Sequence, residues 1–225
     1  MCGRYTLAAG PEYISEYFGL ESPLPDFQPS YNISPGGDVP VIWQAPADGR
    51  ACSMMHWGLI PHWAKEPSTK YRMINAKAET LDERPAYRSA FRHRRCLIPA
   101  SGFYEWKAEP NGKQPYYIQP ANAELFAFAG LWEYWEGNHT INSCTIITIP
   151  ANRSIAAIHD RMPGLIARQH FSTWLDPNFN ETPALQALLL PDENIDVKIH
   201  PVSKTVNNPA TDNPELIEPV PATLS

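Results

Sequence analysis

Residues 96–107 read CLIPASGFYEWK, two short apolar and aromatic runs joined by a Ser-Gly pair. Runs of the same kind, separated by turn residues, follow at Pro115–Gln119, Leu125–Leu131 and Ser143–Ile149. Short β-branched and aromatic segments with turn residues between them are typical of strands joined by hairpins. This half of the chain therefore predicts a curled, mainly antiparallel sheet that begins with strands at Cys96–Pro99 and Phe103–Lys107.

The flanking sequence adds a few strands and several short helices. We expect further strands at Val39–Gln44, Ala51–Ile60 and Val197–Ile199, and a Pro-, Ser- and Gly-rich loop over residues 20–38. The expected helices are Pro11–Phe18, Leu81–Arg94 (with Thr80 as its N-cap), Asn152–Ile158, Gln169–Leu175 and Pro183–Leu189. The pattern predicts an α+β fold, one domain over residues 1–225 with short peripheral helices, ending in an extended Pro-rich segment from about residue 209.

Composition excludes several classes of protein. Seven Trp, ten Tyr and eight Phe in 225 residues supply a substantial core and exclude a disordered chain. No apolar run is long enough to span a membrane, and we expect no signal peptide. The four cysteines lie far apart without a C-x-x-C pair, so we expect no disulfide framework, no metal site and a cytoplasmic location.

Charge is distributed unevenly along the chain. The net charge of −6 arises in residues 176–225, which contain eight acidic residues and two lysines. Residues 84–95 instead hold five arginines and no acid. Such a run is a solvated helix face or part of a phosphate-binding groove, and the sequence leaves both interpretations open.

Cys2 directly follows the initiator methionine. Removal of Met1 would leave a free α-amine and a thiol on neighbouring carbons. Such an amine condenses with an aldehyde to an imine, and the thiol then closes a five-membered thiazolidine. Reference pKa values leave roughly a tenth of an α-amine neutral at pH 7, enough for this reaction to start. Position alone favours the plainer interpretation, in which Cys2 is the second residue of an unstructured terminus.

Seven short motifs, which follow one another along the chain, bear on how Cys2 is interpreted. They are MCGR at 1–4, YNISPG at 31–36, WGLIP at 57–61, INAKAET at 74–80, GFYEW at 102–106, IHDRMP at 158–163 and HPVS at 200–203. Taken singly, each has a structural explanation, such as a paired acid in a strand or a buried histidine. Together they resemble the SRAP family of abasic-site processing proteins, which includes bacterial and animal members, and the resemblance covers nearly the whole chain.

The resemblance implies a function and a set of site residues. SRAP proteins bind single-stranded DNA and form a covalent thiazolidine with the ring-opened aldehyde of an abasic site. The implied catalytic residues are Cys2 as nucleophile, Asn75 as hydrogen-bonding partner of the sugar or the N-terminus, Glu105 as proton donor and His159 as proton shuttle. The implied DNA-binding residues are Arg4, Lys77 and Arg161 on phosphates, with Asn32, Pro35 and Trp63 along the DNA path. We expect no cofactor, a monomer, and association with the nucleoid or with replication forks.

Two positions depart from the common family pattern. Lys77 stands where many relatives have arginine, which replaces a forked phosphate contact by a point charge. Ala64 follows Trp63 where many relatives have a second aromatic residue, which reduces the surface for base stacking. Neither departure touches the proposed chemistry.

Three other functions use the same residues. A thiol protease needs Cys2 as a thiolate beside a base, together with a peptide-binding cleft; self-processing that exposes Cys2 is a narrower form of this activity. A binding module needs the DNA contacts but no covalent step. A β-elimination lyase needs only the imine, and trapping of that imine by the thiol would suppress strand cleavage.

Overall fold

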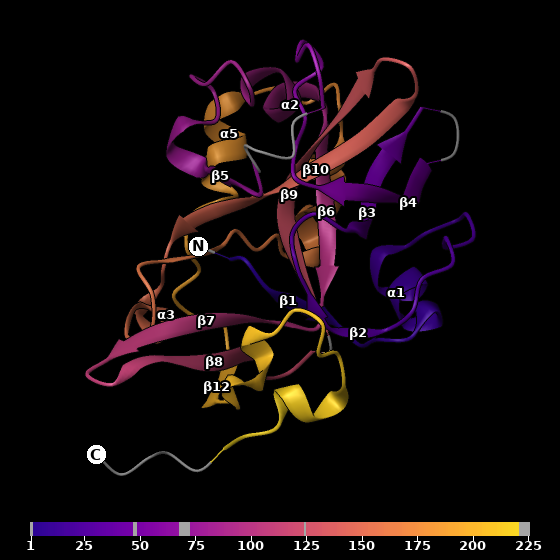
Figure 1. The fold of residues 1–225 in the computed structure, drawn as a ribbon. Coiled ribbons are helices and arrows are strands. Elements are labelled where there is room, and N and C mark those ends of the chain that lie inside the picture. Colours follow the sequence, from indigo (N-terminus) through magenta and orange to yellow (C-terminus); the bar gives the residue numbers. More distant parts are fainter. Residues whose placement is uncertain (1, 47–48, 68–72, 124, 221–225) are drawn as a thin grey trace.

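The strands of the computed structural model form two sheets (Figure 1). The structure describes residues 2–46, 49–67, 73–123 and 125–220. The strands are β1 (Tyr5–Leu7), β2 (Ser30–Ile33), β3 (Asp38–Ala45), β4 (Gly49–Trp57), β5 (Asn75–Lys77), β6 (Arg95–Ala100), β7 (Gly102–Glu109), β8 (Gly112–Pro120), β9 (Phe126–Glu136), β10 (Thr140–Pro150), β11 (Arg161–Pro163) and β12 (Val197–Pro201). The helices are α1 (Pro11–Phe18), α2 (Arg88–His93), α3 (Arg153–Ala156), α4 (Phe171–Leu175) and α5 (Thr182–Ala187), with 3₁₀ turns η1 (Ala78–Thr80), η2 (Arg168–His170), η3 (Lys204–Asn207) and η4 (Pro214–Ile217).

The larger sheet closes on itself as a barrel. β10, β4, β3, β6 and β9 are successive neighbours, and β9 pairs again with β10. β5 and β11 extend the sheet along β10. The described pairings are antiparallel except where β10 runs beside β4 and β5. The expected α+β class, with a curled and mainly antiparallel sheet and short helices, is confirmed.

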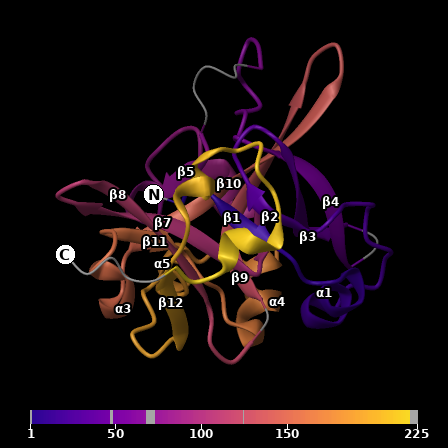
Figure 2. The same ribbon diagram turned by 60° about the horizontal axis from the view of Figure 1, so that its bottom comes forward.

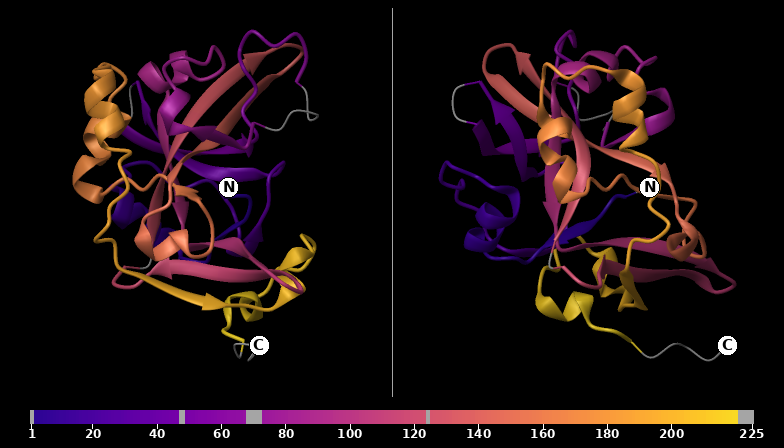
Figure 3. Two further views of the ribbon diagram at one scale, coloured as in Figure 1. Left: turned by 90° about the vertical axis from the view of Figure 1, so that its left-hand side faces the viewer. Right: turned by 180° about the vertical axis from the view of Figure 1, so that it is seen from behind.

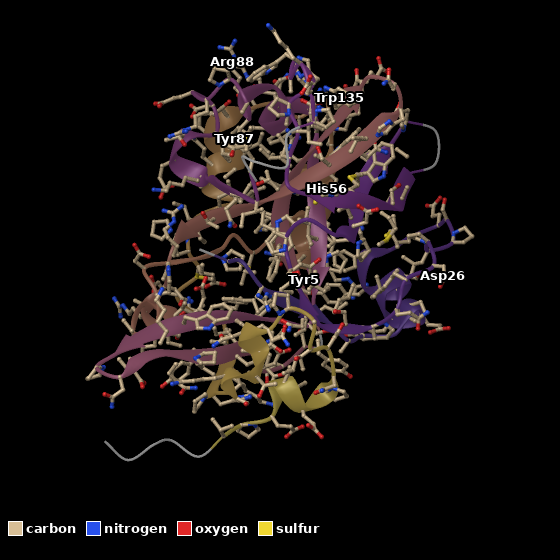
Figure 4. The ribbon with its side chains drawn as sticks, viewed as in Figure 1. Tyr5, Asp26, His56, Tyr87, Arg88 and Trp135 are labelled. Atoms are coloured by element: carbon tan, nitrogen blue, oxygen red, sulfur yellow. The ribbon has the colours of Figure 1, made fainter. Side chains whose placement is uncertain are left out.

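The smaller sheet is antiparallel, in the order β12-β8-β7-β1-β2, and lies below the barrel in Figure 1. β1 is the strand of this sheet that crosses close to the barrel (Figure 3). Its Tyr5 lies at the centre of the molecule (Figure 4) and is buried edge-on against Trp57 and Phe128, with ring centroids 5.3 and 5.8 Å away. These aromatic contacts fix the first residues of the chain between the two sheets.

The alternation of side chains along β7 separates two clusters. Phe103 packs into the main core, whereas Tyr104 belongs to a second cluster with Tyr117 and Val202. Because residues two apart in a strand share a face, Glu105 lies on the face of Phe103, toward the barrel. A buried carboxylate is thereby placed between the two sheets.

The C-terminal segment crosses the smaller sheet, seen in yellow over β1 and β2 in Figure 2. Asp212 accepts hydrogen bonds from the backbone N–H of Tyr31 (2.6 Å) and the hydroxyl of Ser30 (2.7 Å). The indole N–H of Trp106 donates to Asn207 at 2.8 Å. The segment that we expected to be extended from residue 209 also contains the 3₁₀ turn η4.

Several predicted elements are wrong in extent or type. The expected loop over 20–38 contains strand β2. The expected helix Leu81–Arg94 is helical only from Arg88, because Pro85 lacks an N–H and disfavours helical geometry at the residue before it. Thr80 is consequently the end of η1 and not an N-cap. The three-residue strands β1, β5 and β11 are too short to show an alternating pattern and were not predicted.

The remaining elements agree closely with the sequence. Helix α1 has the predicted bounds, with Gly19 in the left-handed conformation at its end (φ 63°). The strands predicted within and around residues 96–150 are present, and most are longer than expected. The strand expected at Ala51–Ile60 begins earlier and ends at Trp57. Helices α3, α4 and α5 each overlap a predicted helix. Among the helices of the described chain, none is long and apolar enough to cross a membrane.

Candidate active site

Cys2 and Asn75 are joined directly. The side-chain amide of Asn75, at the start of β5, donates a hydrogen bond of 2.9 Å to the backbone carbonyl of Cys2. β5 is held in turn by its parallel pairing with β10 and by the hydroxyl of Tyr87, which donates to the carbonyl of Asn75 at 3.3 Å. The amide oxygen Oδ1 of Asn75 is buried and has no hydrogen-bond partner among the described residues. It is an acceptor available to a bound molecule.

Glu105 and His159 form the second half of the site. Oε2 of Glu105 lies 3.9 Å from Nε2 of His159. The backbone N–H of Arg161 donates to Nδ1 of His159 at 3.0 Å, which places the proton of the neutral ring on Nε2, facing Glu105. Asp160 lies 2.9 Å from the same Nδ1 and can accept a hydrogen bond from it when the ring is a charged imidazolium. Nε2–H therefore faces Glu105 as a donor, and an imidazolium in this position can pass its Nε2 proton to the Glu105 carboxylate.

A buried asparagine builds the turn that presents His159. Asn152 caps α3 by accepting from the backbone N–H of Ile155 (3.2 Å), and its amide donates to the carbonyl of Asp192 (3.0 Å). Helix α3 ends within one turn, and the N–H of His159 bonds the carbonyl of Ile155 at 3.1 Å. His159 is thus held just before the start of β11, its backbone N–H by Ile155 and its ring by the N–H of Arg161.

Burial controls the protonation of the two acidic groups. Cys2 has no exposed surface, and desolvation raises the pKa of its thiol well above the ordinary value, reinforced by the nearby Glu105 carboxylate. Burial likewise raises the pKa of Glu105, although His159 opposes part of this shift. Both effects favour neutral groups at the site, a thiol and a carboxylic acid.

Arg161 and Lys77 flank the end of β10. The guanidinium of Arg161 forms a two-pronged ion pair with Glu79, one arm of which measures 3.0 Å, and also contacts the hydroxyl of Thr148 at 3.3 Å. Lys77 is opposite Thr148 in the β5–β10 register, and its side chain is exposed. The alternation of Asn75 and Lys77 along β5 puts both on one side, as expected; Glu79 lies beyond the strand in η1.

Arg4 and Asn32 are engaged with each other and with the C-terminal segment. Nη1 of Arg4 donates to Oδ1 of Asn32 (2.7 Å) and to the carbonyl of Val206 (2.8 Å). The amide of Asn32 donates to the carbonyls of Asn208 (3.0 Å) and Thr211 (2.6 Å). Asn32 is buried, so its side chain orients Arg4 and ties down the strap of residues 204–212.

Pro35 and Trp63 lie in turns next to β4. The backbone N–H of Gly36, which follows Pro35, donates to the carbonyl of Trp57 at 3.0 Å. Trp63 follows the end of β4 by six residues, and 58% of its surface is exposed, an unusual fraction for tryptophan. Both residues occupy turns from which a ligand could be contacted.

The basic run of residues 84–95 divides between interior and surface. Arg95 is buried and donates to backbone carbonyls of Phe91, Arg92, Trp174, Asp176 and Phe179, so it is structural. Arg94 forms an ion pair of 2.8 Å with Glu133. The other three, Arg84, Arg88 and Arg92, are exposed. The part of the chain that the structure describes holds no group of three or more side chains suited to a metal ion.

Sequence reasoning missed the residues that hold the site in place. Tyr87 fixes Asn75, Asn152 fixes the His159 turn, and Glu79 with Thr148 fixes Arg161. Glu79 belongs to the INAKAET motif, and Arg161 belongs to the IHDRMP motif. Their opposite charges could have suggested the ion pair. The other three carry no signal, because their partners are backbone groups or lie far away in sequence.

Comparisons with known proteins agree on family and fold. The model of the family described as "SOS response associated peptidase (SRAP)" matches residues 1–209. The chain is 42% identical to the abasic site processing protein YoqW of Bacillus subtilis, over 97% of this chain and 99% of that one, and 36% identical to the abasic site processing protein HMCES of Xenopus tropicalis, over 96% and 77%. A crystal structure of a protein from Bacteroides thetaiotaomicron superposes with a TM-score of 0.87 at 23% identity, covering 97% of this chain and all of that one.

Proposed function

Because this chain belongs to the SRAP family, we propose that it processes abasic sites in single-stranded DNA by forming a thiazolidine crosslink through Cys2. The observation that carries the proposal is the meeting of four side chains from distant segments. Asn75 holds Cys2 at 2.9 Å, and Glu105 and His159 lie 3.9 Å apart beside them. The names of the relatives point to abasic DNA as the substrate.

In the proposed reaction, removal of Met1 frees the α-amine of Cys2. The amine nitrogen attacks C1′ of the ring-opened sugar, and the resulting carbinolamine loses its hydroxyl as water to give an imine. Sγ then adds to the imine carbon, and the thiol proton passes to the nitrogen. One water leaves in all, and no oxidant or reductant is required.

Each site residue has a role in this sequence. Glu105, whose burial favours the protonated form, protonates the ring oxygen O4′ as the sugar opens; after it has regained a proton, it protonates the carbinolamine hydroxyl that leaves as water. His159, once charged, returns a proton through Nε2 to the carboxylate that Glu105 becomes after it has donated. The buried Oδ1 of Asn75 accepts a hydrogen bond from the sugar or the amine. Arg4, Lys77 and Arg161 bind phosphates, Asn32 orients Arg4, and Pro35 and Trp63 border the bases.

The protonation of Cys2 argues for an amine-first order and against proteolysis. A thiol protease requires a thiolate, whereas burial raises the pKa of the Cys2 thiol. In the crosslinking reaction, the thiol is needed only after the imine has formed, when its proton has a destination on nitrogen. The site therefore fits carbonyl trapping better than attack on peptides.

Intact mass spectrometry tests the proposal. The purified protein is weighed before and after incubation with a single-stranded oligonucleotide carrying one abasic site. We expect a chain without Met1 that gains the mass of the oligonucleotide less one water and is stable without reductant. Cys52→Ala should behave like the wild type and Cys2→Ala should form no such adduct. Retention of Met1, or binding without an adduct, would instead support the binding-module alternative.

A further inference from the structure

The turn that carries Trp63 is tied down on both sides of the tryptophan. The carbonyl of Ala64 accepts from the indole N–H of Trp135 at 2.8 Å, and Nδ1 of His62 lies 3.1 Å from Oε2 of Glu133. Further back, the N–H of Ile60 donates to the hydroxyl of Ser143 at 2.9 Å. Residues 60, 62 and 64 are thus held, while Trp63 itself is the exposed member of the turn.

All three anchors belong to the β9–β10 hairpin. Figure 4 shows Trp135 on this hairpin, which projects beyond the rest of the barrel. Alternation along β9 gives Glu133 and Trp135 one face, whereas Trp132, Tyr134 and Glu136 occupy the other. Trp132 packs against Trp43 with centroids 4.9 Å apart, away from the turn. Two of the three anchors, Glu133 and Trp135, therefore share one face of β9, and the third, Ser143, lies on β10.

Glu133 is a buried carboxylate held in one orientation. It is 2% exposed, and the same oxygen that faces His62 accepts from Arg94 at 2.8 Å. Its other oxygen accepts from the backbone N–H of Tyr134 at 3.1 Å. A carboxylate fixed by a guanidinium and a backbone amide is a rigid anchor for a half-exposed side chain such as His62.

We propose that Glu133 and Trp135 are positioning residues that hold the turn of residues 60–64 so that Trp63 meets a DNA base as a preformed stacking surface. The inference rests on the proposed function, because it takes single-stranded DNA as the ligand of Trp63. A turn that is ordered before binding loses less conformational freedom when the base stacks on it.

A double-mutant cycle tests this role. Binding is measured by fluorescence anisotropy with a single-stranded oligonucleotide that carries a tetrahydrofuran analogue of the abasic site, which has no aldehyde and forms no adduct. We expect Trp63→Ala to weaken binding about tenfold, within the range for loss of one base stack. Glu133→Gln, Trp135→Phe and the half-exposed His62→Ala should each weaken it severalfold, but by less than about twofold when Trp63 is already alanine.

Matched controls lie on the opposite face of the same strand. Glu136→Gln and Trp132→Phe should leave affinity unchanged. With an aldehyde-bearing oligonucleotide, the anchor variants should raise the half-saturating DNA concentration while the rate at saturation stays at the wild-type value. A merely structural role would lower affinity equally with and without Trp63, and that result, or no change in affinity, would overturn the inference. If the wild type forms no adduct while the cycle still shows coupling, the crosslinking proposal fails and the role of Glu133 and Trp135 stands.

Discussion

Nε2 of His159, two residues before the start of β11, lies 3.9 Å from Oε2 of Glu105 in the middle of β7. This separation is short enough for a proton to move with a small shift of either side chain, and burial keeps Glu105 biased toward the acid. The pair is the structural basis of the first two predictions.

Glu105→Gln should slow adduct formation at saturating DNA by about 10²-fold or more, because general acid catalysis contributes on this order. The wild-type rate should fall as pH rises through the raised pKa of Glu105, since the acid form is then lost, and the glutamine variant should lack this fall. Single-turnover rates across pH measure both effects. The control is Glu109→Gln, which changes an exposed acid four residues further along β7. If Glu105→Gln formed the adduct at the wild-type rate, Glu105 would have no part in the mechanism.

The same substitution should affect stability in a pH-dependent manner. Because the folded-state pKa of Glu105 is raised, its ionisation opposes folding: the stability is full below the ordinary carboxyl pKa of about 4.3 and falls as pH rises through the folded-state value. Glu105→Gln removes this loss. The difference in melting temperature, variant minus wild type, should therefore grow between pH 4 and pH 8 in calorimetry, and a difference that is constant or shrinks with pH contradicts the prediction.

The sequence was sufficient for the fold class and the family, and it supplied the candidate site residues that the structure brings together. Hairpin strands and helix α1 follow from local composition, and seven ordered motifs located Cys2, Asn75, Glu105 and His159. The hydrogen bonds that hold these residues in place could not be predicted from the sequence. The bonds of Tyr87 to Asn75 and of Arg4 to Val206 join segments that only the tertiary fold brings together, and no local pattern encodes them. Three-residue strands such as β5 exist only through their pairing with β10.

The basic run of residues 84–95 also shows that the sequence does not reveal which of several like residues is buried. Five arginines look equivalent in the sequence, yet Arg95 is 2% exposed while Arg88 is at the surface (Figure 4). Arg95→Met should lower the free energy of unfolding by about 3 kcal/mol or more, because its charged hydrogen bonds to backbone carbonyls are lost. Arg88→Gln should change it by less than about 0.5 kcal/mol. Urea denaturation separates the two, and equal effects would contradict the assignment of Arg95 as structural.

Asn32→Ala should reduce both stability and DNA binding. Its amide serves carbonyls of the strap, and its Oδ1 orients Arg4 at 2.7 Å. Leaving these partly buried carbonyls and the Arg4 guanidinium without their partner should cost about 1–3 kcal/mol in urea denaturation. Asp212→Asn is the matched control, since it loosens the strap at β2 but leaves the Arg4–Asn32 bond intact. The control should lose some stability and keep its DNA affinity; equal losses of affinity would mean that Arg4 is not the link.

Cys2→Ala distinguishes trapping from elimination. The variant keeps the α-amine, and therefore the capacity to form an imine at C1′, but lacks the thiol that closes the ring. An imine left open labilises the 3′ phosphate, so strand cleavage at the abasic site should increase severalfold over the wild type, while the stable adduct disappears. Denaturing electrophoresis of a labelled oligonucleotide, with and without borohydride to capture the imine, measures cleavage and imine separately. Asn75 should hold the alanine backbone as it holds Cys2, because its bond is to the carbonyl oxygen. Less cleavage than in the wild type, with the imine still captured, would mean that the thiol promotes elimination and does not suppress it.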